Sequence, residues 1–304
     1  MKVVDELRYY PKASARHLVT HRSNLIGIFY WSVDGAGLRQ SFITHVLDSF
    51  KTTVGEFGYD ILLFSNSQPP FDGYSLLERV KNRDVDGVLL FGIPKETTQG
   101  LIDAEIPIVG VDYVVPGRWV GTVTSDNRRA IYDLIRVLYD NGYRRIGFAH
   151  GPLAFPVAME RLQGYYSGMA AVGLVPDPRW IVDGAFNVEG GRLAASQILR
   201  SGGLPEILIC SSDFTAIGAL QVLQGAGVSI PDDIGIIGFD DVDGASYVYP
   251  QLTTISQKKT EIGRRAGEIM VSLIDRKNSL TPMHYVLPTE LVVRQSTRPL
   301  SVRI

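Results

Sequence analysis

The sequence predicts an α/β fold with two lobes, each built on a parallel sheet flanked by helices. From Asn24 onward, short and almost continuous apolar runs alternate with longer amphipathic segments. This alternation is typical of parallel strands whose two faces are covered by helices. The chain has 304 residues, enough for two domains of ordinary size. The order of segments also recurs, because GYDILLF at Gly58 and GYRRIGF at Gly142 each open a series of strand, helix and strand.

Short apolar runs, rich in Ile, Leu, Val and Phe, predict the strands. In chain order they are Leu25–Tyr30, Ile61–Phe64, Gly87–Phe91, Ile108–Val111, Ile146–Ala149, Ile207–Cys210, Ile234–Phe239 and Tyr285–Leu287. All are far shorter than the roughly 20 apolar residues that a membrane helix needs, so we expect no contact with a membrane.

The stretches between these runs have the spacing of amphipathic helices. They are Leu38–Phe57, Tyr74–Asn82, Asn127–Asp140, Met159–Val172, Gly190–Arg200, Phe214–Ala226 and Glu261–Asp275. Glycine follows two of them just before the next strand, at Gly58 and Gly142. Helices commonly end at such a glycine, which adopts left-handed backbone without strain.

The composition excludes several classes of protein. Cys210 is the single cysteine and the five histidines are scattered, so we expect neither an internal disulfide nor a zinc site. The N-terminus carries charges throughout and lacks the apolar segment of a secretory signal, which favours a cytoplasmic protein. The net charge is −2, yet residues 1–24 hold five basic and two acidic side chains. Such an arm hints at contact with nucleic acid, although its charge alone favours a solvated terminus.

Aromatic, acidic and hydroxyl side chains follow several of the predicted strands. Ligands of open parallel sheets bind beyond the carboxyl ends of the strands. The residues found there are Trp31, Asp34, Phe91, His150, Ser211, Ser212, Asp213, Asp240 and Asp241. Because carboxylates accept hydrogen bonds from hydroxyls and aromatic faces cover the apolar side of a ring, this set suits a neutral, polyhydroxylated ligand.

Motifs of the common enzyme classes are absent or incomplete. Gly35 and Gly37 follow the first strand, but Gln40 stands where the dinucleotide-binding fingerprint needs its third glycine. No P-loop, G-x-S-x-G, H-E-x-x-H or C-x-x-C motif occurs. An enzyme could use His150 and Asp240, but a lone histidine and an acid after a strand are more often ligand contacts or helix caps. We therefore predict no enzyme, no cofactor and no metal site.

Ten sequence blocks occur in a characteristic order over nearly the whole chain. They are RSNLIGIF, GYDILLFSN, VDGVLL, IPIVGVD, SDNRRA followed by GYRRIGFAHGP, ERLQGYYSGM, SSDFTAIGAL, IPDDIGIIGFDD, LTTISQ and LPTELVVRQSTR. In this order and spacing they resemble the LacI/GalR family of bacterial transcription regulators. The resemblance implies a periplasmic-binding-protein-like effector region, dimeric in the cytoplasm, whose lobes close on a small molecule. An extracytoplasmic solute-binding protein shares this fold, but it would carry a signal peptide and no hinge motif.

The first 24 residues resemble the end of the family's DNA-binding headpiece, its Tyr-x-Pro linkage and its hinge helix. The family's helix-turn-helix has no counterpart in these residues. Leu18 matches the leucine that family members insert into the minor groove, and Ala15 and Arg16 lie beside it. The resemblance therefore implies that the full-length regulator binds operator DNA.

The resemblance also assigns an effector-binding site. Arg161, in ERLQGY, matches the arginine that binds the effector through its planar fork of N–H groups. Asp240, in GFDD, matches the acid that holds ligand hydroxyls or a ring nitrogen. Phe186 matches an aromatic stacking wall, although Ala185 stands where the family usually has an acid. Without a ligand role, Arg161 would form a surface salt bridge and Phe186 would pack within its lobe.

Three further residues are assigned to the same site. Asp126 matches an acid on the first-lobe side, and its structural alternative is the N-cap of the following helix. Ser212 stands where Asn is common, which shortens or removes a hydrogen bond, and Gln257 matches a residue at the lobe crossover. The resemblance also places four residues in variable loops that face the same ligand: Trp31, Asp34, Phe91 and His150. For the aromatic residues Trp31 and Phe91, the structural alternative is core packing.

The resemblance implies a first lobe of residues 25–140 and 259–288 and a second lobe of residues 141–258 and 289–304. Helix Leu38–Phe57 would supply part of a homodimer face, although amphipathic burial explains its pattern equally well. A ligand that binds the closed lobes better shifts the population toward them, and this movement would reach the hinge helices. We thus predict a ligand-responsive repressor with a sugar-like effector.

Overall fold

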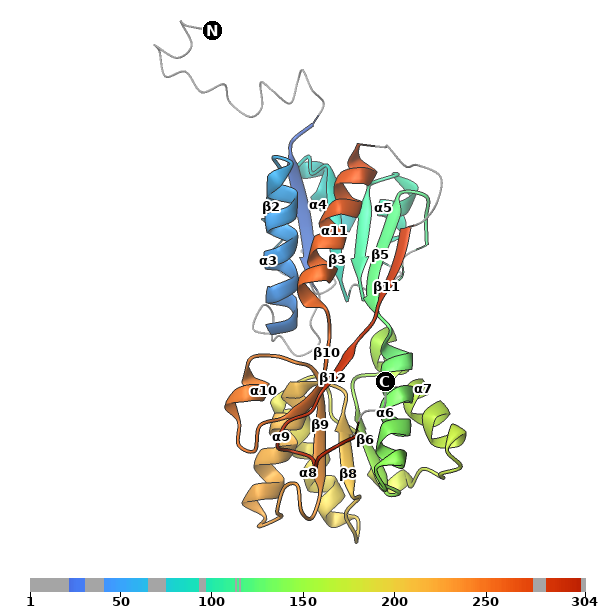
Figure 1. Cartoon of the computed structure of the whole chain (residues 1–304). Helices are drawn as coiled ribbons and strands as arrows, with labels where there is room; N and C mark the ends of the chain where they lie inside the picture. Colours follow the sequence, from blue (N-terminus) through green and yellow to red (C-terminus); the bar gives the residue numbers. More distant parts are fainter. Residues whose placement is uncertain are drawn as a thin grey trace, which may run out of the picture. The chain divides into compact units, whose positions relative to one another are not determined.

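The structure is a computed structural model that describes residues 22–30, 41–64, 75–92, 97–112, 114, 116–275 and 283–301. The predictions for Ala15, Arg16, Leu18, Trp31 and Asp34 lie outside these residues. The described chain forms two α/β units, each with its own six-stranded sheet (Figure 1). No helix within the described ranges is long and apolar enough to cross a membrane.

The sheet of the first unit has the strand order β11-β5-β4-β3-β1-β2. Its strands are β1 (Leu25–Tyr30), β2 (Asp60–Leu63), β3 (Gly87–Phe91), β4 (Ile108–Val111), β5 (Val120–Ser125) and β11 (Met283–Leu287). Strands β2, β1, β3, β4 and β5 pair in parallel. All residues of β3 and β4 are buried, as expected for central strands with covered faces.

Helices cover both faces of this sheet. They are α3 (Ser41–Glu56), α4 (Leu76–Asn82), α5 (Gln99–Asp103) and α11 (Lys259–Ile274). Leu76, Val80 and Leu101 pack with strand residues in a buried cluster on the α4 and α5 side. Helix α4 starts with a capping box, in which Ser75 and Glu78 satisfy each other's backbone N–H groups. The predicted helices of this unit therefore form, and α5 is an additional one.

The sheet of the second unit has the order β12-β10-β9-β8-β6-β7. Its strands are β6 (Ile146–His150), β7 (Ile181–Asp183), β8 (Ile207–Cys210), β9 (Gly235–Asp240), β10 (Thr253–Ser256) and β12 (Glu290–Val292). All pairs are parallel except β10 with the edge strand β12. The carboxyl ends of β6, β8, β9 and β10 therefore meet at one edge.

The second sheet is also covered on both faces. The helices are α6 (Asn127–Asp140), α7 (Pro156–Ala171), α8 (Val188–Arg200), α9 (Asp213–Gly225), α10 (Gly244–Tyr247) and the short η3 (Pro178–Trp180). Helices α6 and α7 pack on one buried cluster, and α8 and α9 on the other. Helices α8 and α9 touch so closely that a Cβ at Gly191 would lie 2.0 Å from the carbonyl oxygen of Thr215.

The boundaries between the units differ from the predicted ones. The described chain passes from one unit to the other after Val46, Val123, Ile262 and His284, whereas the predicted boundaries follow residues 140, 258 and 288. Helix α6, predicted in the first lobe, belongs to the second unit, where Ile131 and Ile135 share a buried cluster with Phe239. The GYRRIGF series begins after α6, so it lies one helix beyond the crossing at Val123.

Candidate ligand-binding site

Helix α7 places Arg161 at the carboxyl edge of the second sheet, where its side chain is buried and only 2% of the residue is exposed. Its Nε donates to Oδ1 of Asn127 at 2.8 Å, and its Nη1 donates to the carbonyl oxygen of Ser211 at 2.5 Å. The guanidinium lies 3.6 Å from the centre of the Phe239 ring, a cation–π contact. Arg161 is therefore no surface salt bridge: groups from three elements fix its orientation.

Asp240 ends β9 beside this arginine. Its Oδ1 lies 3.8 Å from Nη1 of Arg161 and accepts a hydrogen bond from Nε2 of Gln257 at 2.7 Å. The next link leads to the end of β5, since Oγ of Ser125 donates to Oε1 of Gln257 at 2.6 Å. The side chains of Arg161 and Asp240 are 3% and 14% exposed. The carboxylate is thus nearly buried, yet its edge reaches the surface.

These contacts close into a ring of polar groups, because Nδ2 of Asn127 donates to the carbonyl oxygen of Ser125 at 3.0 Å. The members, which we call the polar ring, are Arg161, Asn127, Ser125, Gln257 and Asp240. A connected, buried network of this kind is rigid and holds each member in one orientation. The polar ring therefore holds the guanidinium of Arg161 and the carboxylate of Asp240 side by side in fixed orientations.

A second buried acid supports the turn that follows Asp240. Asp213, at the start of α9, is fully buried. Its Oδ1 accepts from Oγ1 of Thr254 at 2.5 Å, and its Oδ2 accepts from the backbone N–H of Val242 at 2.8 Å. Burial, and next the negative charge of Asp240, raise the pKa of Asp213 well above its usual value. Asp213 thus joins α9, β10 and the turn after β9.

The structure gives Asp126 and Ser212 capping roles. Asp126 is the N-cap of α6 and accepts from the backbone N–H of Arg129. Ser212 is buried and caps α9, accepting from the backbone N–H of Thr215 at 3.1 Å. These contacts account for both residues without a ligand. A ligand role for either one stays a prediction.

The remaining predicted residues lie in different surroundings. Phe186 is half-buried, with its ring 5.8 Å from the Arg161 guanidinium and 6.1 Å from the ring of Phe155. His150 ends β6, and its Nδ1 bonds to the carbonyl oxygen of Gly151. Phe91 is buried and lies edge-on to Tyr30 within the first unit, which is ordinary core packing. Of these three, Phe186 lies next to a member of the polar ring, Arg161.

Sequence reasoning missed several residues that build this site. Asn127 and Ser125 both lie in the SDNRRA block. The block indicated this region but not that the Asn127 amide accepts a hydrogen bond from Arg161. Lys259 was not singled out, yet its Nζ donates to the carbonyl oxygens of Asp240 and Asp241, both at 2.6 Å. No local sequence pattern marks such contacts, because their partners lie far apart in the chain.

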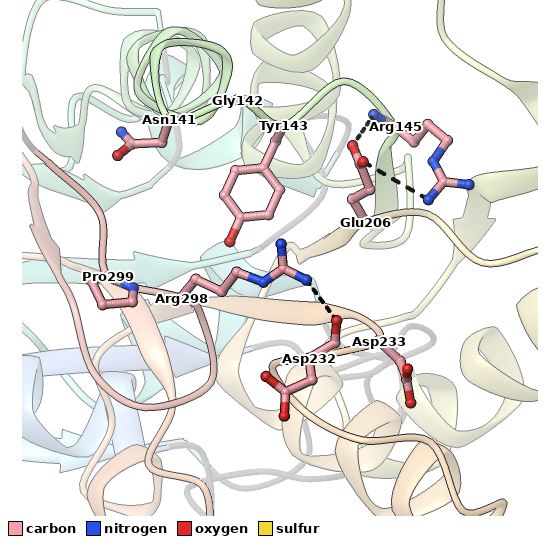
Figure 2. A pocket seen from close by; sticks show the side chains of 9 residues that line it. All are labelled: Asn141, Gly142, Tyr143, Arg145, Glu206, Asp232, Asp233, Arg298 and Pro299. Atoms are coloured by element: carbon pink, nitrogen blue, oxygen red, sulfur yellow. Dashed lines mark hydrogen bonds and ion pairs between the residues drawn. The ribbon is translucent and has the colours of Figure 1, made fainter.

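A separate cavity of about 320 Å³ lies at the other end of the second sheet (Figure 2). Its lining comes from residues that precede β6, β8 and β9 and from the C-terminal segment: Asn141, Gly142, Tyr143, Arg145, Glu206, Asp232, Asp233, Arg298 and Pro299. Figure 2 shows the charged groups facing one another: Glu206 binds Arg145, and Arg298 donates to the carbonyl oxygen of Asp232. This cavity lies at the amino ends of the strands and is not the predicted site.

Within the described part of the chain, no group of three or more His, Cys, Asp or Glu side chains could hold a metal ion. The polar ring offers hydrogen-bond donors and acceptors beside aromatic rings. This chemistry suits recognition of a small polar molecule.

Fold and site together define a class: a two-unit α/β protein with a buried polar network at the carboxyl ends of parallel strands. A family model described as a periplasmic binding protein-like domain matches residues 135–297. The chain belongs to the LacI/GalR family of transcription regulators. The HTH-type transcriptional repressor CytR of Escherichia coli strain K12 is 30% identical over 308 residues, covering 98% of this chain and 86% of the relative.

Other relatives agree with this membership. The ribose operon repressor of Haemophilus influenzae is 29% identical, covering 97% of this chain and 88% of the relative. Among solved structures, the complex of the transcriptional regulator CelR with cellobiose matches with a TM-score of 0.84 and 25% identity over 97% of this chain and 88% of that one. A LacI family regulator from Mycobacterium smegmatis matches with a TM-score of 0.77 and 25% identity over 90% of this chain and 99% of that one.

Proposed function

We propose that this chain is the effector-responsive part of a transcriptional repressor and that its effector is a small sugar or a sugar-like molecule. The polar ring carries the proposal: it holds the charged guanidinium of Arg161 beside the carboxylate of Asp240, an acceptor whose edge reaches the surface, and it fixes the orientation of both groups. Sugar hydroxyls donate to carboxylates and accept from guanidinium groups. Phe186 adds an aromatic face 5.8 Å from the guanidinium, suited to the apolar side of a sugar ring.

The relatives support the same ligand class. One is named as a ribose operon repressor, and one solved structure is a cellobiose complex. The two sugars in these names are neutral and rich in hydroxyls. This matches a site where Arg161, the buried cation among the described residues, already binds neutral and acidic partners. A strongly anionic effector would need further cations there.

Calorimetric titration of the chain with D-ribose, cellobiose, D-glucose and adenine tests the ligand class. We expect saturable binding of at least one sugar. Asp240→Asn keeps the shape and the acceptor for Gln257 but removes the charge, so sugar affinity should fall about tenfold to 100-fold. The matched control is Asp140→Asn at the exposed end of α6, which should leave affinity unchanged. Binding of adenine without any sugar rejects the sugar class.

An enzymatic use of the site is the weaker alternative, because the nitrogen Nδ1 of His150 is bonded to the backbone of Gly151. We propose that bound sugar is released unchanged. Proton NMR of a sugar incubated for hours with the protein should show no new signals. Conversion that scales with protein concentration and is lost in His150→Gln would restore the enzyme hypothesis.

We further propose that the regulator is a cytoplasmic homodimer whose N-terminal segment, with Ala15, Arg16 and Leu18, contacts operator DNA. An effector that binds one arrangement of the two units more tightly shifts the population toward it. By linkage, operator DNA must then change effector affinity by the same factor by which effector changes DNA affinity. Sedimentation velocity of the full-length regulator should give a dimer, and a monomer at micromolar concentration would contradict this part.

A further inference from the structure

The turn that follows β9 has an unusual backbone. Asp240 has a φ of 110° and Asp241 a φ of 53°, so two consecutive residues other than glycine adopt left-handed conformations. Such conformations carry strain and persist only where surrounding contacts hold them. The strain lies at Asp240, whose carboxylate belongs to the polar ring. The contacts that hold this turn therefore help to fix the position of the Asp240 carboxylate in the polar ring.

Lys259 contacts the backbone of both strained residues. Its Nζ donates to the carbonyl oxygens of Asp240 and Asp241, each at 2.6 Å. Two other residues each make one hydrogen bond to the turn: Arg294 donates to Oδ1 of Asp241 at 2.7 Å, and Asp213 accepts from the N–H of Val242. Hydrogen bonds from an ammonium group are charge-assisted and strong. Lys259 thus bridges the two peptide units whose backbone is strained.

The position of Lys259 is not explained by the stability of its own helix. It is the first residue of α11, and a cation is unfavourable at the positive N-terminal end of a helix dipole. Lys258, its neighbour, is exposed, whereas Lys259 is partly buried against the turn. The electrostatic penalty at the helix start is offset by the two carbonyl oxygens of the turn.

We propose that Lys259 is a positioning residue of the effector site: its two hydrogen bonds hold the Asp240–Asp241 turn in the conformation that presents the Asp240 carboxylate to Gln257 and to a bound effector. This inference rests on the proposed function. Lys259 donates to the backbone oxygens of the turn and would thus act on the effector through Asp240.

The test compares three variants with the wild type. Lys259→Met keeps the length of the side chain but cannot donate, and Lys259→Arg keeps the charge and the donors. Lys258→Met is the matched control, since it removes the same charge from the neighbouring exposed position. Two measurements are made on each: hydrogen exchange of the Val242 amide, which needs no ligand, and calorimetric affinity for the sugar that the wild type binds most tightly among D-ribose, cellobiose and D-glucose.

In Lys259→Met, we expect the Val242 amide to exchange at least about tenfold faster and sugar affinity to fall about tenfold to 100-fold. Lys259→Arg should recover most of the affinity, and Lys258→Met should match the wild type in both measurements. A circular dichroism melt shows whether each variant is folded. If Lys259→Met does not fold, Lys259→Gln, which keeps neutral donors, replaces it. In that variant we expect a smaller increase in the exchange rate of the Val242 amide and a smaller loss of sugar affinity.

Several outcomes overturn the proposal. Unchanged sugar affinity in Lys259→Met rejects it, even when the Val242 amide exchanges faster, because the turn would then be loosened without affecting binding. An equal loss of sugar affinity in Lys258→Met would show that the effect comes from the removal of a positive charge and not from the hydrogen bonds of Lys259. A wild type that binds no sugar contradicts the proposed function itself, whereas a wild type that binds and a Lys259→Met variant that binds equally well contradict only the positioning role.

Discussion

The guanidinium of Arg161 lies 3.6 Å from the centre of the Phe239 ring, while its Nε and Nη1 donate to Asn127 and Ser211. Phe239 precedes Asp240 on β9, so one strand supplies both the platform beneath the arginine and the acid beside it. A buried cation is tolerated only when its donors are satisfied. The stacking and hydrogen bonds meet that condition and leave the guanidinium oriented.

Arg161→Lys tests whether the site needs only the positive charge of Arg161 or also the planar shape of its guanidinium group. An ammonium group keeps the charge but cannot stack on Phe239 and also donate to Asn127 and Ser211 with planar geometry. We expect sugar affinity to fall about tenfold to 100-fold and the free energy of unfolding to fall by about 2–3 kcal/mol. Calorimetry and urea unfolding measure the two effects. Arg192→Lys, on the exposed surface of α8, is the control, and an equal affinity loss there would refute the assignment.

Asp213 should make stability depend on pH. Burial raises its folded-state pKa, so in the pH range above the unfolded pKa of about 4 the unfolded chain releases a proton that the folded chain keeps. The free energy of unfolding therefore falls as the pH rises through this range and levels off above the folded pKa. In Asp213→Asn, the amide oxygen can accept from the Val242 N–H, and the amide N–H can donate to Oγ1 of Thr254 if that hydroxyl rotates to accept. This neutral side chain should remove the decline between pH 4 and pH 7.

Urea unfolding at several pH values checks this prediction. Asp140→Asn, an exposed acid at the end of α6, serves as the control and should keep the wild-type slope. A slope in Asp213→Asn that equals the wild-type slope would show that Asp213 titrates alike in both states.

The contact between α8 and α9 predicts a steric effect at Gly191. Gly191→Ala would place a methyl group 2.0 Å from the carbonyl oxygen of Thr215, so the helices must separate and the variant should lose about 2 kcal/mol or more of unfolding free energy. At Gly55, near the end of α3, no atom lies within 4 Å of the added carbon. Gly55→Ala should therefore gain about 0.5 kcal/mol. Thermal unfolding of both variants compares the two effects, and similar values would contradict the packing argument.

Asp86 anchors the segment that leads into β1. Its two carboxylate oxygens accept from the backbone N–H groups of Ser23 at 3.0 Å and Asn24 at 2.8 Å. Asp86→Ala should cost about 1–2 kcal/mol of unfolding free energy and speed hydrogen exchange at both amides. Glu56→Ala, an exposed acid at the end of α3, is the control. Protected amides in Asp86→Ala would mean that other contacts hold this segment.

The sequence alone predicted most of the fold, because hydrophobic periodicity is a local property. Helix α6 was predicted with its observed bounds, and the strand runs through Leu25–Tyr30, Gly87–Phe91 and Ile207–Cys210 match as well. The predicted strands omitted the short β7 and β12 and also β5 and β10. In β5 and β10 the buried positions include threonines. The hydroxyls of Thr253 and Thr254 form hydrogen bonds with Thr297 and Asp213, which allows these polar side chains to be buried. Because threonine is polar, such strands lack the continuous apolar pattern by which the other strands were predicted.

The sequence also predicted Arg161, Asp240 and Gln257 as site residues through the family resemblance, and the structure joins them in the polar ring. Only the tertiary structure decided that Asn127 and Ser125 complete this ring, that Ser212 and Asp126 cap helices, and that α6 belongs to the second unit. Ser125 and Gln257 are 132 positions apart in the chain. Their hydrogen bond joins the end of β5 to the residue that follows β10, two strands of different sheets, and local sequence patterns do not encode such a contact.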